Sequence, residues 1–374
     1  MVVRGRARVD RRTKNLVRRL QPGEIAVISH GGIDKLAAQG LIESRCRLVL
    51  NAEKSLSPDY PNEGPLMLLD AGIPIVDALG PAVMEIPEGA EVEVEVADGA
   101  VFLNGALIAR GEPLTREKVR AGMAAAKERL GEVLVRFVDN TLTYARKEVD
   151  LIAGAVPVPP LKTRLEGKHA LVVVRGFNYK EDLQAIRPYI NEMRPVLIGV
   201  DGGADALREF GYRPDIVIGD MDSVSDQALR EATDVVVHAY PNGEAPGLKK
   251  VRELGIPAVT LPLAGTSEDV AMLLAYEKGA RLIVAVGTHS NVLDFLEKGR
   301  RGMGSTFLVR LKVGAILVDA KGVSQLYRSR VKFRYLAQVV AAALLPFAAV
   351  AIISPSIRQL LRLILIQFRV LLGL

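Results

Sequence analysis

The chain has 374 residues, of which 49% are hydrophobic, and its net charge is +6. This length suggests two or three domains of roughly 100–200 residues each. The single cysteine, Cys46, excludes an internal disulfide, and no Cys/His cluster suggests a zinc site.

The positive charge is concentrated at the two ends of the chain. Residues 1–20 contain eight Arg or Lys and one Asp, and residues 328–374 contain seven Arg or Lys and no acid, so the body between them is acidic. A nucleic-acid-binding domain would carry its positive charge on the folded surface, and we therefore expect no nucleic-acid partner. We interpret residues 1–20 as a flexible basic tail, which is either solvated or attracted to an anionic membrane surface.

A small mixed α/β domain is expected over residues 21–113. Short apolar runs at 25–29 and 47–50 predict strands, and the alternating run 91–96 predicts a strand with one wet face. The order of elements is similar to that of the swivelling phosphohistidine domains of dikinases. No phosphoacceptor motif accompanies this order, so we interpret His30 as a structural residue.

A long helix is expected over residues 114–152, with Thr115 as its N-cap. Its apolar residues recur at spacings of four and three, which is a coiled-coil period: Val119, Met123, Ala126, Leu130, Val133 and Phe137. Tyr144 continues this seam, with the polar Asn140 inside it. The pattern predicts either a homodimer through this helix or a helix that packs along its own domains. Residues 153–167 contain the run Val156–Pro160 and are expected to form a stiff Pro-rich linker.

Strands alternate with helices over residues 168–327, which predicts an α/β domain with a doubly wound parallel sheet. At its centre, the apolar runs 196–200 and 216–218 each end in glycine and aspartate. A helix between these runs makes the two strands parallel, so their carboxyl ends share the edge of the sheet where ligands bind in such folds. The chain contains neither the dinucleotide-binding glycine motif nor the P-loop motif.

Carboxylates gathered at one edge repel one another unless a cation lies among them. We predict an Mg²⁺ site, shared with substrate phosphates, whose metal ligands are Asp201, Asp220, Asp222 and Asp269. The alternative is that these aspartates cap helices and turns, because the segment 266–269 also has the form of a capping box.

The residues that we expect to bind a nucleotide follow predicted strands or begin a helix. They are Arg175, Asp201, Gly202, Gly203, Gly219, Ser223, Thr266, Ser267, Asp269 and His289. For His289, the alternative is that it caps the next helix.

The uncharged apolar stretch 335–353 is close to the ~20 residues that cross a bilayer. It predicts a transmembrane helix within a membrane anchor over 328–374, although a buried helix is the alternative. The preceding basic residues, Arg328, Arg330, Lys332 and Arg334, would keep the body of the protein in the cytoplasm. Residues 357–374 either lie in the membrane interface or return as the second arm of a hairpin.

The segments Asp201–Ala204, Pro214–Asp215 and Gly219–Ser223 resemble the motifs of the thiamin pyrophosphokinase catalytic domain. The resemblance implies that Asp220 and Asp222 are catalytic carboxylates, which hold Mg²⁺ and ATP while pyrophosphate moves to thiamin. It also matches Asp269 to the aspartate of the family's Thr-Asp element. The chain departs from the family at 287–291, where a Gly-Gly-Arg-x-Asp-His element is expected, and it lacks the β-sandwich that helps to bind thiamin.

Over about residues 22–334 the chain also resembles the SteA-type bacterial cytokinetic-ring proteins. The segments that carry this resemblance are 60–65, 199–225, 265–274 and 299–311. It implies a membrane-anchored protein of the division site that acts with a membrane-protein partner in cell separation. Our leading hypothesis is a division protein whose Mg²⁺–nucleotide-binding domain serves in sensing or scaffolding. The alternative is an active ATP-dependent thiamin pyrophosphokinase.

Overall fold

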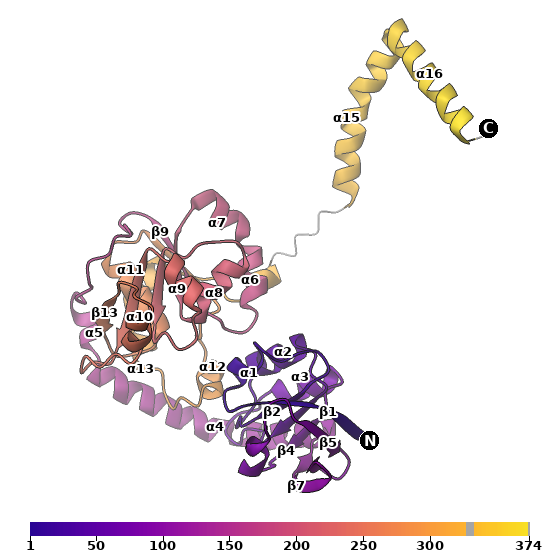
Figure 1. Cartoon of the computed structure of the whole chain (residues 1–374). Helices are drawn as coiled ribbons and strands as arrows, with labels where there is room; N and C mark the ends of the chain where they lie inside the picture. The colour runs from indigo at the N-terminus through magenta and orange to yellow at the C-terminus, as the bar shows by residue number, and fades with distance from the viewer. Residues whose placement is uncertain (327–332, 373–374) are drawn as a thin grey trace. The chain divides into compact units, whose positions relative to one another are not determined.

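The fold is known from a computed structural model, which describes residues 1–326 and 333–372 (Figure 1). The chain divides into two compact units, Met1–Val323 and Ser324–Leu374. The first unit contains two β-sheets, and each sheet is formed by a separate part of the sequence.

The amino-terminal sheet has eight strands in the order β7-β6-β5-β1-β2-β3-β4-β8. The strands are β1 (Val2–Asp10), β2 (Ile25–Ile28), β3 (Leu48–Asn51), β4 (Ile75–Asp77), β5 (Glu91–Glu95), β6 (Ala100–Leu103), β7 (Ala106–Arg110) and β8 (Glu112–Pro113). Strands β1 to β4 are parallel to one another, whereas β5, β6 and β7 form an antiparallel extension and β8 pairs antiparallel with β4.

The prediction of a flexible tail over residues 1–20 is wrong. Strand β1 lies in the middle of the sheet, where it pairs in parallel with β2 and antiparallel with β5. The sequence carries the signal in its alternation, because Val3 and Ala7 are buried in the core while Arg4 and Arg6 between them are exposed. The arginines of this strand lie on its exposed face, and Val3 and Ala7 lie on its buried face. Its positive charge is therefore compatible with a place in the sheet.

Helices and buried side chains cover the faces of this sheet. The helices are α1 (Thr13–Leu16), α2 (Lys35–Glu43), α3 (Gly64–Asp70) and the 3₁₀ helix η1 (Pro81–Glu85). Along β2, Ile25 and Val27 belong to one core cluster, while Ala26 and Ile28 belong to another. Since side chains alternate along a strand, these two clusters lie on opposite faces of the sheet.

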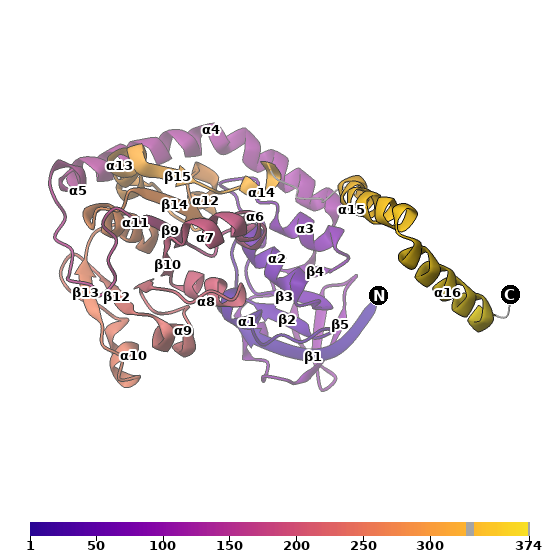
Figure 2. The same cartoon turned by 90° about the horizontal axis from the view of Figure 1, so that it is seen from above.

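A long helix, α4 (Arg116–Lys147), joins the two parts of the first unit and is followed by α5 (Asp150–Ala153). Thr115 caps α4 by accepting a hydrogen bond from the amide of Lys118. Helix α4 packs against α3 and against α13 (Gly304–Val313), and Figure 2 shows it running past both. Four residues of the predicted seam are buried within the chain: Val119, Ala126, Val133 and Phe137. The homodimer stays a prediction.

The second sheet has seven strands in the order β13-β12-β11-β10-β9-β14-β15, and each pair of adjacent strands is parallel. The strands are β9 (His169–Val173), β10 (Val196–Val200), β11 (Ile216–Gly219), β12 (Asp234–Ala239), β13 (Val259–Pro262), β14 (Leu282–Val286) and β15 (Leu317–Asp319). The chain moves outward from β9 to β13 and then returns to place β14 on the other side of β9. The predicted α/β domain with a parallel sheet is therefore present, and its topological switch point lies between β9 and β14.

Both faces of the second sheet are covered, which explains why its central strands are apolar throughout. The remaining helices of this part are α6 (Tyr179–Ala185), α7 (Arg187–Met193), α8 (Gly202–Glu209), α9 (Asp226–Glu231), α10 (Leu248–Glu253), α11 (Ser267–Glu277), α12 (Val292–Glu297), η2 (Gly314–Ile316) and α14 (Val323–Leu326). Helices α11 and α13 contribute to the core on one face, and α6, α7 and α8 contribute to the core on the other.

The long helices in the described part of the second unit are α15 (Phe333–Ile353) and α16 (Pro355–Leu372). The prediction of a transmembrane helix over 335–353, and with it the cell-membrane localisation, is contradicted. Within the ranges 1–326 and 333–372, no helix has the length and apolar character needed to cross a membrane. Pro346 lies inside α15, and the apolar sequence is broken between the two helices at Ser354. Of the predicted basic flank, Arg328, Arg330 and Lys332 lie outside the described residues.

Candidate functional site

Asp201 and Asp220 follow two neighbouring parallel strands, β10 and β11, and therefore lie at the same edge of the sheet. Asp201 has a backbone φ of +47°, a conformation that is uncommon for residues other than glycine. Its amide donates a hydrogen bond to the carbonyl of Ile218 (2.9 Å), and its Oδ1 accepts one from the amide of Met221 (3.1 Å). Strain of this kind is concentrated at functional sites.

Two glycines allow the backbone to come close to this edge. A Cβ atom on Gly219 would lie 2.0 Å from Oδ1 of Asp201, and one on Gly203 would lie 1.9 Å from the carbonyl oxygen of Val173. Both distances are far below van der Waals contact, so neither position accepts a side chain without a backbone shift. The glycines that were predicted to bind a nucleotide thus shape the site, and Gly203 also packs α8 against β9.

Burial of the carboxyl group and the negative charge of Asp220 raise the pKa of Asp201 to about 7. Two carboxyl groups that interact in this way share either a proton or a cation. Mg²⁺ is commonly held by one or two carboxylates while phosphate oxygens and water complete its shell. The chemistry of the Asp201–Asp220 pair therefore fits Mg²⁺ bound together with a phosphate-bearing ligand.

The other two predicted metal ligands have different partners, although the amide of Asp222 donates a hydrogen bond to Oδ1 of Asp220 (3.0 Å). The carboxylate of Asp222 accepts a hydrogen bond from Nη1 of Arg12 (3.2 Å), and its side chain is 51% exposed. Across the described part of the chain, no three Asp, Glu, His or Cys side chains gather as a metal site. The four predicted aspartates therefore do not gather as one cluster, and Asp201 and Asp220 stay a predicted pair of metal ligands.

Asp269 takes the structural role that the sequence left open for it. It is fully buried as the third residue of α11, where it forms a capping box with Thr266. Its Oδ2 accepts hydrogen bonds from the hydroxyls of Thr266 (2.9 Å) and Thr306 (2.8 Å), and burial raises its pKa. Its Oδ1 is buried and has no hydrogen-bond partner among the described residues.

His289 follows β14 and pairs with Glu268, the second residue of α11. Glu268 accepts hydrogen bonds from the amide of His289 (2.9 Å) and from its Nδ1 (2.6 Å). Nζ of Lys298 lies 3.5 Å from Oε1 of Glu268. Although burial opposes ionisation, the contact with His289 lowers the pKa of Glu268 to about 2. The helix cap predicted as the alternative role of His289 is instead Asn291, whose side chain accepts from the amide of Asp294.

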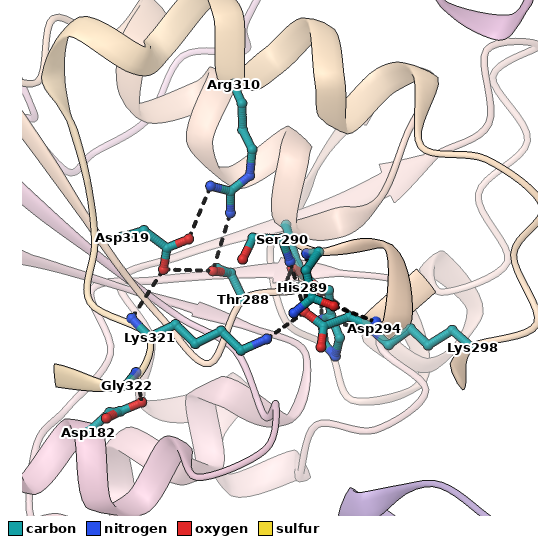
Figure 3. A network of polar contacts seen from close by, with 12 residues as sticks. Asp182, Thr288, His289, Ser290, Asp294, Lys298, Arg310, Asp319, Lys321 and Gly322 are labelled. Carbon is teal, nitrogen blue, oxygen red and sulfur yellow. Dashed lines mark hydrogen bonds and ion pairs between the residues drawn. The ribbon is translucent and has the colours of Figure 1, made fainter. Parts of the chain in front are cut away.

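A polar network supports the loop that carries His289, and Figure 3 shows its side chains gathered beside this loop. Arg310 donates to Asp319 (3.1 Å) and to Thr288 (3.4 Å), and Lys321 pairs with Asp294. Asp294 also accepts a hydrogen bond from the amide of Ser290 (3.0 Å). These contacts fix the loop on the β14 side of the switch point.

Arg175 occupies the β9 side of the same switch point. Its Nη2 donates to Glu209 (2.6 Å), while its Nε is buried without a partner among the described residues. A Cβ atom on Gly202 would lie 3.0 Å from Cδ of Arg175, so the glycine at the start of α8 leaves space for this arginine. Arg175 and His289 therefore flank the position where ligands bind in doubly wound sheets.

A cavity of about 1310 Å³ connects most of these residues. The predicted site residues that line it are Arg175, Asp201, Gly202, Asp220, Ser223, Thr266, Ser267 and His289. Asp222 lines a smaller cavity of about 370 Å³, which it shares with Asp220. The large cavity is roomy enough for a ligand of nucleotide size.

The carboxyl-terminal part of the chain matches a known family. Residues 321–372 match the model of the SteA-like C-terminal domain. This match supports the SteA-like family that the motifs indicated, and it hints at a role related to cell division. The matched residues lie beyond the strands that carry Asp201, Asp220 and His289, so the likeness of the α/β domain to thiamin pyrophosphokinases stays a proposal.

No curated protein matches the chain. One similar solved structure is 3-isopropylmalate dehydratase from Methanocaldococcus jannaschii, with 13% identity over 36% of this chain and 98% of that chain and a TM-score of 0.22. Another is the MAf glycosyltransferase from Magnetospirillum magneticum AMB-1, with 13% identity over 74% of this chain and 48% of that chain and a TM-score of 0.26. Similarity this low carries no argument about fold or function.

Several residues beside the cavity were not predicted from the sequence. Arg11, Arg12, Lys14 and Arg18 line it from the amino-terminal part, and Glu268 and Lys298 line it near His289. His238 was also missed: its Nδ1 lies 3.2 Å from the hydroxyl of Ser267, and its Nε2 lies 3.0 Å from the carbonyl oxygen of Leu263. His238 is the penultimate residue of β12, next to the edge that carries the aspartates, and this position is the signal that could have identified it.

Proposed function

We propose that this protein acts in a process related to cell division and that its α/β domain binds a nucleotide together with Mg²⁺, as a sensor or scaffold. The observation that carries the proposal is the Asp201–Asp220 pair at the wall of the large cavity. A carboxylate pair of this kind can hold a cation, and the cavity is large enough for a nucleotide. The SteA-like domain supports the cellular role, and the resemblance to pyrophosphokinase motifs supports the choice of ligand.

In this proposal Asp201 and Asp220 hold the metal ion, and Mg²⁺ when bound neutralises charge on the phosphate oxygens. The amides at the start of α11 line the same cavity at Thr266 and Ser267, where the positive end of the helix dipole favours an anion. Arg175 provides a fixed positive charge at the switch point. The ligand's phosphates are therefore expected between Asp220 and the start of α11.

Titration calorimetry of the full chain with ATP, in the presence and absence of Mg²⁺, tests the proposal. We expect Mg²⁺-dependent binding, which Asp220→Asn weakens at least about tenfold because a metal ligand loses its charge. The matched control is Asp226→Asn, which changes an exposed aspartate at the start of α9. The proposal fails if no nucleotide binds, or if Asp220→Asn and Asp226→Asn bind equally well.

A turnover assay with Mg²⁺, ATP and thiamin distinguishes the sensor from an enzyme. The sensor is supported if ATP binds tightly and no thiamin diphosphate is formed. Formation of thiamin diphosphate that Asp220→Asn abolishes would instead establish the pyrophosphokinase activity that the motifs imply.

A further inference from the structure

We propose that the basic segment Arg11–Arg18 of the amino-terminal part forms the phosphate-binding wall of the nucleotide site, so that the ligand is held between the two sheets. This inference rests on the proposed function and extends it, because it specifies a ligand with a di- or triphosphate group. It also gives a role to a segment that the sequence suggested was a flexible tail.

The first observation is direct contact between the segment and the aspartate edge. Nη1 of Arg12 lies 3.2 Å from a carboxylate oxygen of Asp222, and Nη2 of Arg18 donates to the carbonyl oxygen of Ser223 (2.6 Å). These contacts join residues more than 200 positions apart in the sequence. The basic segment therefore lies against the same loop, Gly219–Ser223, that carries Asp220.

The second observation is that strand ends from both sheets meet at the cavity. Strands β1 and β2 are parallel, and the residues that follow them, Arg11 and Ser29, line the cavity. Strands β9 and β10 of the second sheet are also parallel, and the residues that follow them, Val174 and Asp201, line the same cavity. Ligands bind at the carboxyl ends of parallel strands, and here two such edges share one cavity.

The third observation is the distribution of charge around the cavity. The aspartate pair lies on the wall formed by the second sheet, which also carries basic residues: Arg175, Lys180, Arg208, Lys298 and Arg300. The wall from the amino-terminal part carries Asp34 and Glu43, and it adds four basic side chains in one short segment: Arg11, Arg12, Lys14 and Arg18. A metal ion at the Asp201–Asp220 pair can cover only one side of a polyphosphate. The remaining oxygens need cations, and the planar guanidinium of arginine binds phosphate oxygens in pairs.

The present partner of Arg12 is easily exchanged. The side chains of Arg12 and Asp222 are 61% and 51% exposed, and ion pairs of this kind contribute little to stability. Arg12 can therefore leave Asp222 for a phosphate at small cost. Among the described residues, the side chain of Arg12 is held by this exposed carboxylate and not by a buried group.

Calorimetry on the full chain with Mg²⁺–ATP and with AMP tests this inference. The variants are Arg12→Ala and Arg18→Ala, and the control is Arg6→Ala, which removes an exposed arginine of β1 outside the cavity lining. We expect Arg12→Ala and Arg18→Ala each to weaken ATP binding about tenfold, with a much smaller effect on AMP, because the lost contacts are to the outer phosphates. Arg12→Lys should recover part of the affinity, since it keeps the charge.

The outcomes separate this inference from the proposed function. If the unchanged protein binds no nucleotide, the proposed function fails and this inference fails with it. If ATP binds and Asp220→Asn abolishes binding, but the two alanine variants bind normally, only the inference about the basic segment is overturned. Equal losses for ATP and AMP would show that these arginines merely hold the two parts together, which also overturns it.

Hydrogen exchange on the unchanged protein provides a second measurement in case the alanine variants do not fold. Addition of Mg²⁺–ATP should slow amide exchange in residues 11–18 relative to the strand β7 (Ala106–Arg110), which lies at the far edge of the amino-terminal sheet. Binding of ATP without any change in residues 11–18 would contradict the inference.

Discussion

Gly219 lies so close to Asp201 that a Cβ atom on Gly219 would be 2.0 Å from Oδ1 of Asp201. The change Gly219→Ala should therefore displace this carboxylate and weaken Mg²⁺–ATP binding at least about tenfold, with a loss of about 1–3 kcal/mol in the free energy of unfolding. Calorimetry and urea denaturation measure the two effects. Gly314→Ala is the control, because no atom lies within 4 Å of the added Cβ there. Unchanged binding by Gly219→Ala would exclude Asp201 from the ligand site.

The pair formed by Glu268 and His289 should stabilise the loop after β14. Glu268→Gln keeps the size of the side chain but removes the charge that faces His289 and Lys298. Because the His289 ring and Lys298 then lose the carboxylate that they contact, we expect a loss of about 1–3 kcal/mol in the free energy of unfolding at pH 7. Urea denaturation measures this, with the exposed Glu192→Gln on α7 as a control. Equal stability of the two variants would show that the pair contributes nothing.

Glu297 should make the folded protein less stable as the pH rises. Burial, together with the charge of Asp34, raises its pKa from 4.5 to about 7, so the folded state holds a proton that the unfolded state has already released. The stabilisation is complete below pH 4.5 and is lost as the pH rises through 7. Glu297→Gln should therefore reduce the fall in Tm between pH 5 and pH 8. Thermal melts at both pH values check this, and an unchanged fall in Tm would contradict it.

Gly131 is an exposed glycine within α4, and an added Cβ would have no atom of the chain within 4 Å. Gly131→Ala should therefore raise the free energy of unfolding by about 0.5–1 kcal/mol, because alanine has the higher helix propensity. Thermal melting tests this. Destabilisation, accompanied by a change of mass in light scattering, would instead show that a second copy of the chain contacts this face of α4.

Much of the second sheet could be predicted from the sequence, because buried parallel strands are continuous apolar runs. The runs 196–200 and 282–286 coincide with β10 and β14. Strand β1 could not be predicted in the same way, because its arginines hide a short alternation whose buried members are as small as Ala7. For such a strand, pairing with β2 and β5 decides the structure, and composition does not.

The candidate site was predictable only in part, for a similar reason. Asp201 and Asp220 follow adjacent strands, and local sequence is enough to bring them together. Local sequence indicated two roles for Asp269, a capping residue and a metal ligand. Both roles place the carboxylate at the start of a helix, so the sequence alone cannot distinguish them. The contact of Arg12 with Asp222 joins residues 210 positions apart, and no local pattern contains that information.

Helix α4 touches both parts of the first unit: a Cβ on Gly122 would lie 2.8 Å from Leu56, while Met303 donates to Thr141 (3.1 Å) near the other end of the helix. One residue inserted between these contacts would turn one part against the other by roughly 100°. Insertion of seven would restore the direction to within about 20° but move the parts about 10 Å apart. The contact between Arg12 and Asp222 therefore depends on the rotation that α4 sets between the two parts. We therefore expect the number of residues in this helix to affect the proposed binding of a nucleotide, although no described side chain of α4 lines the cavity.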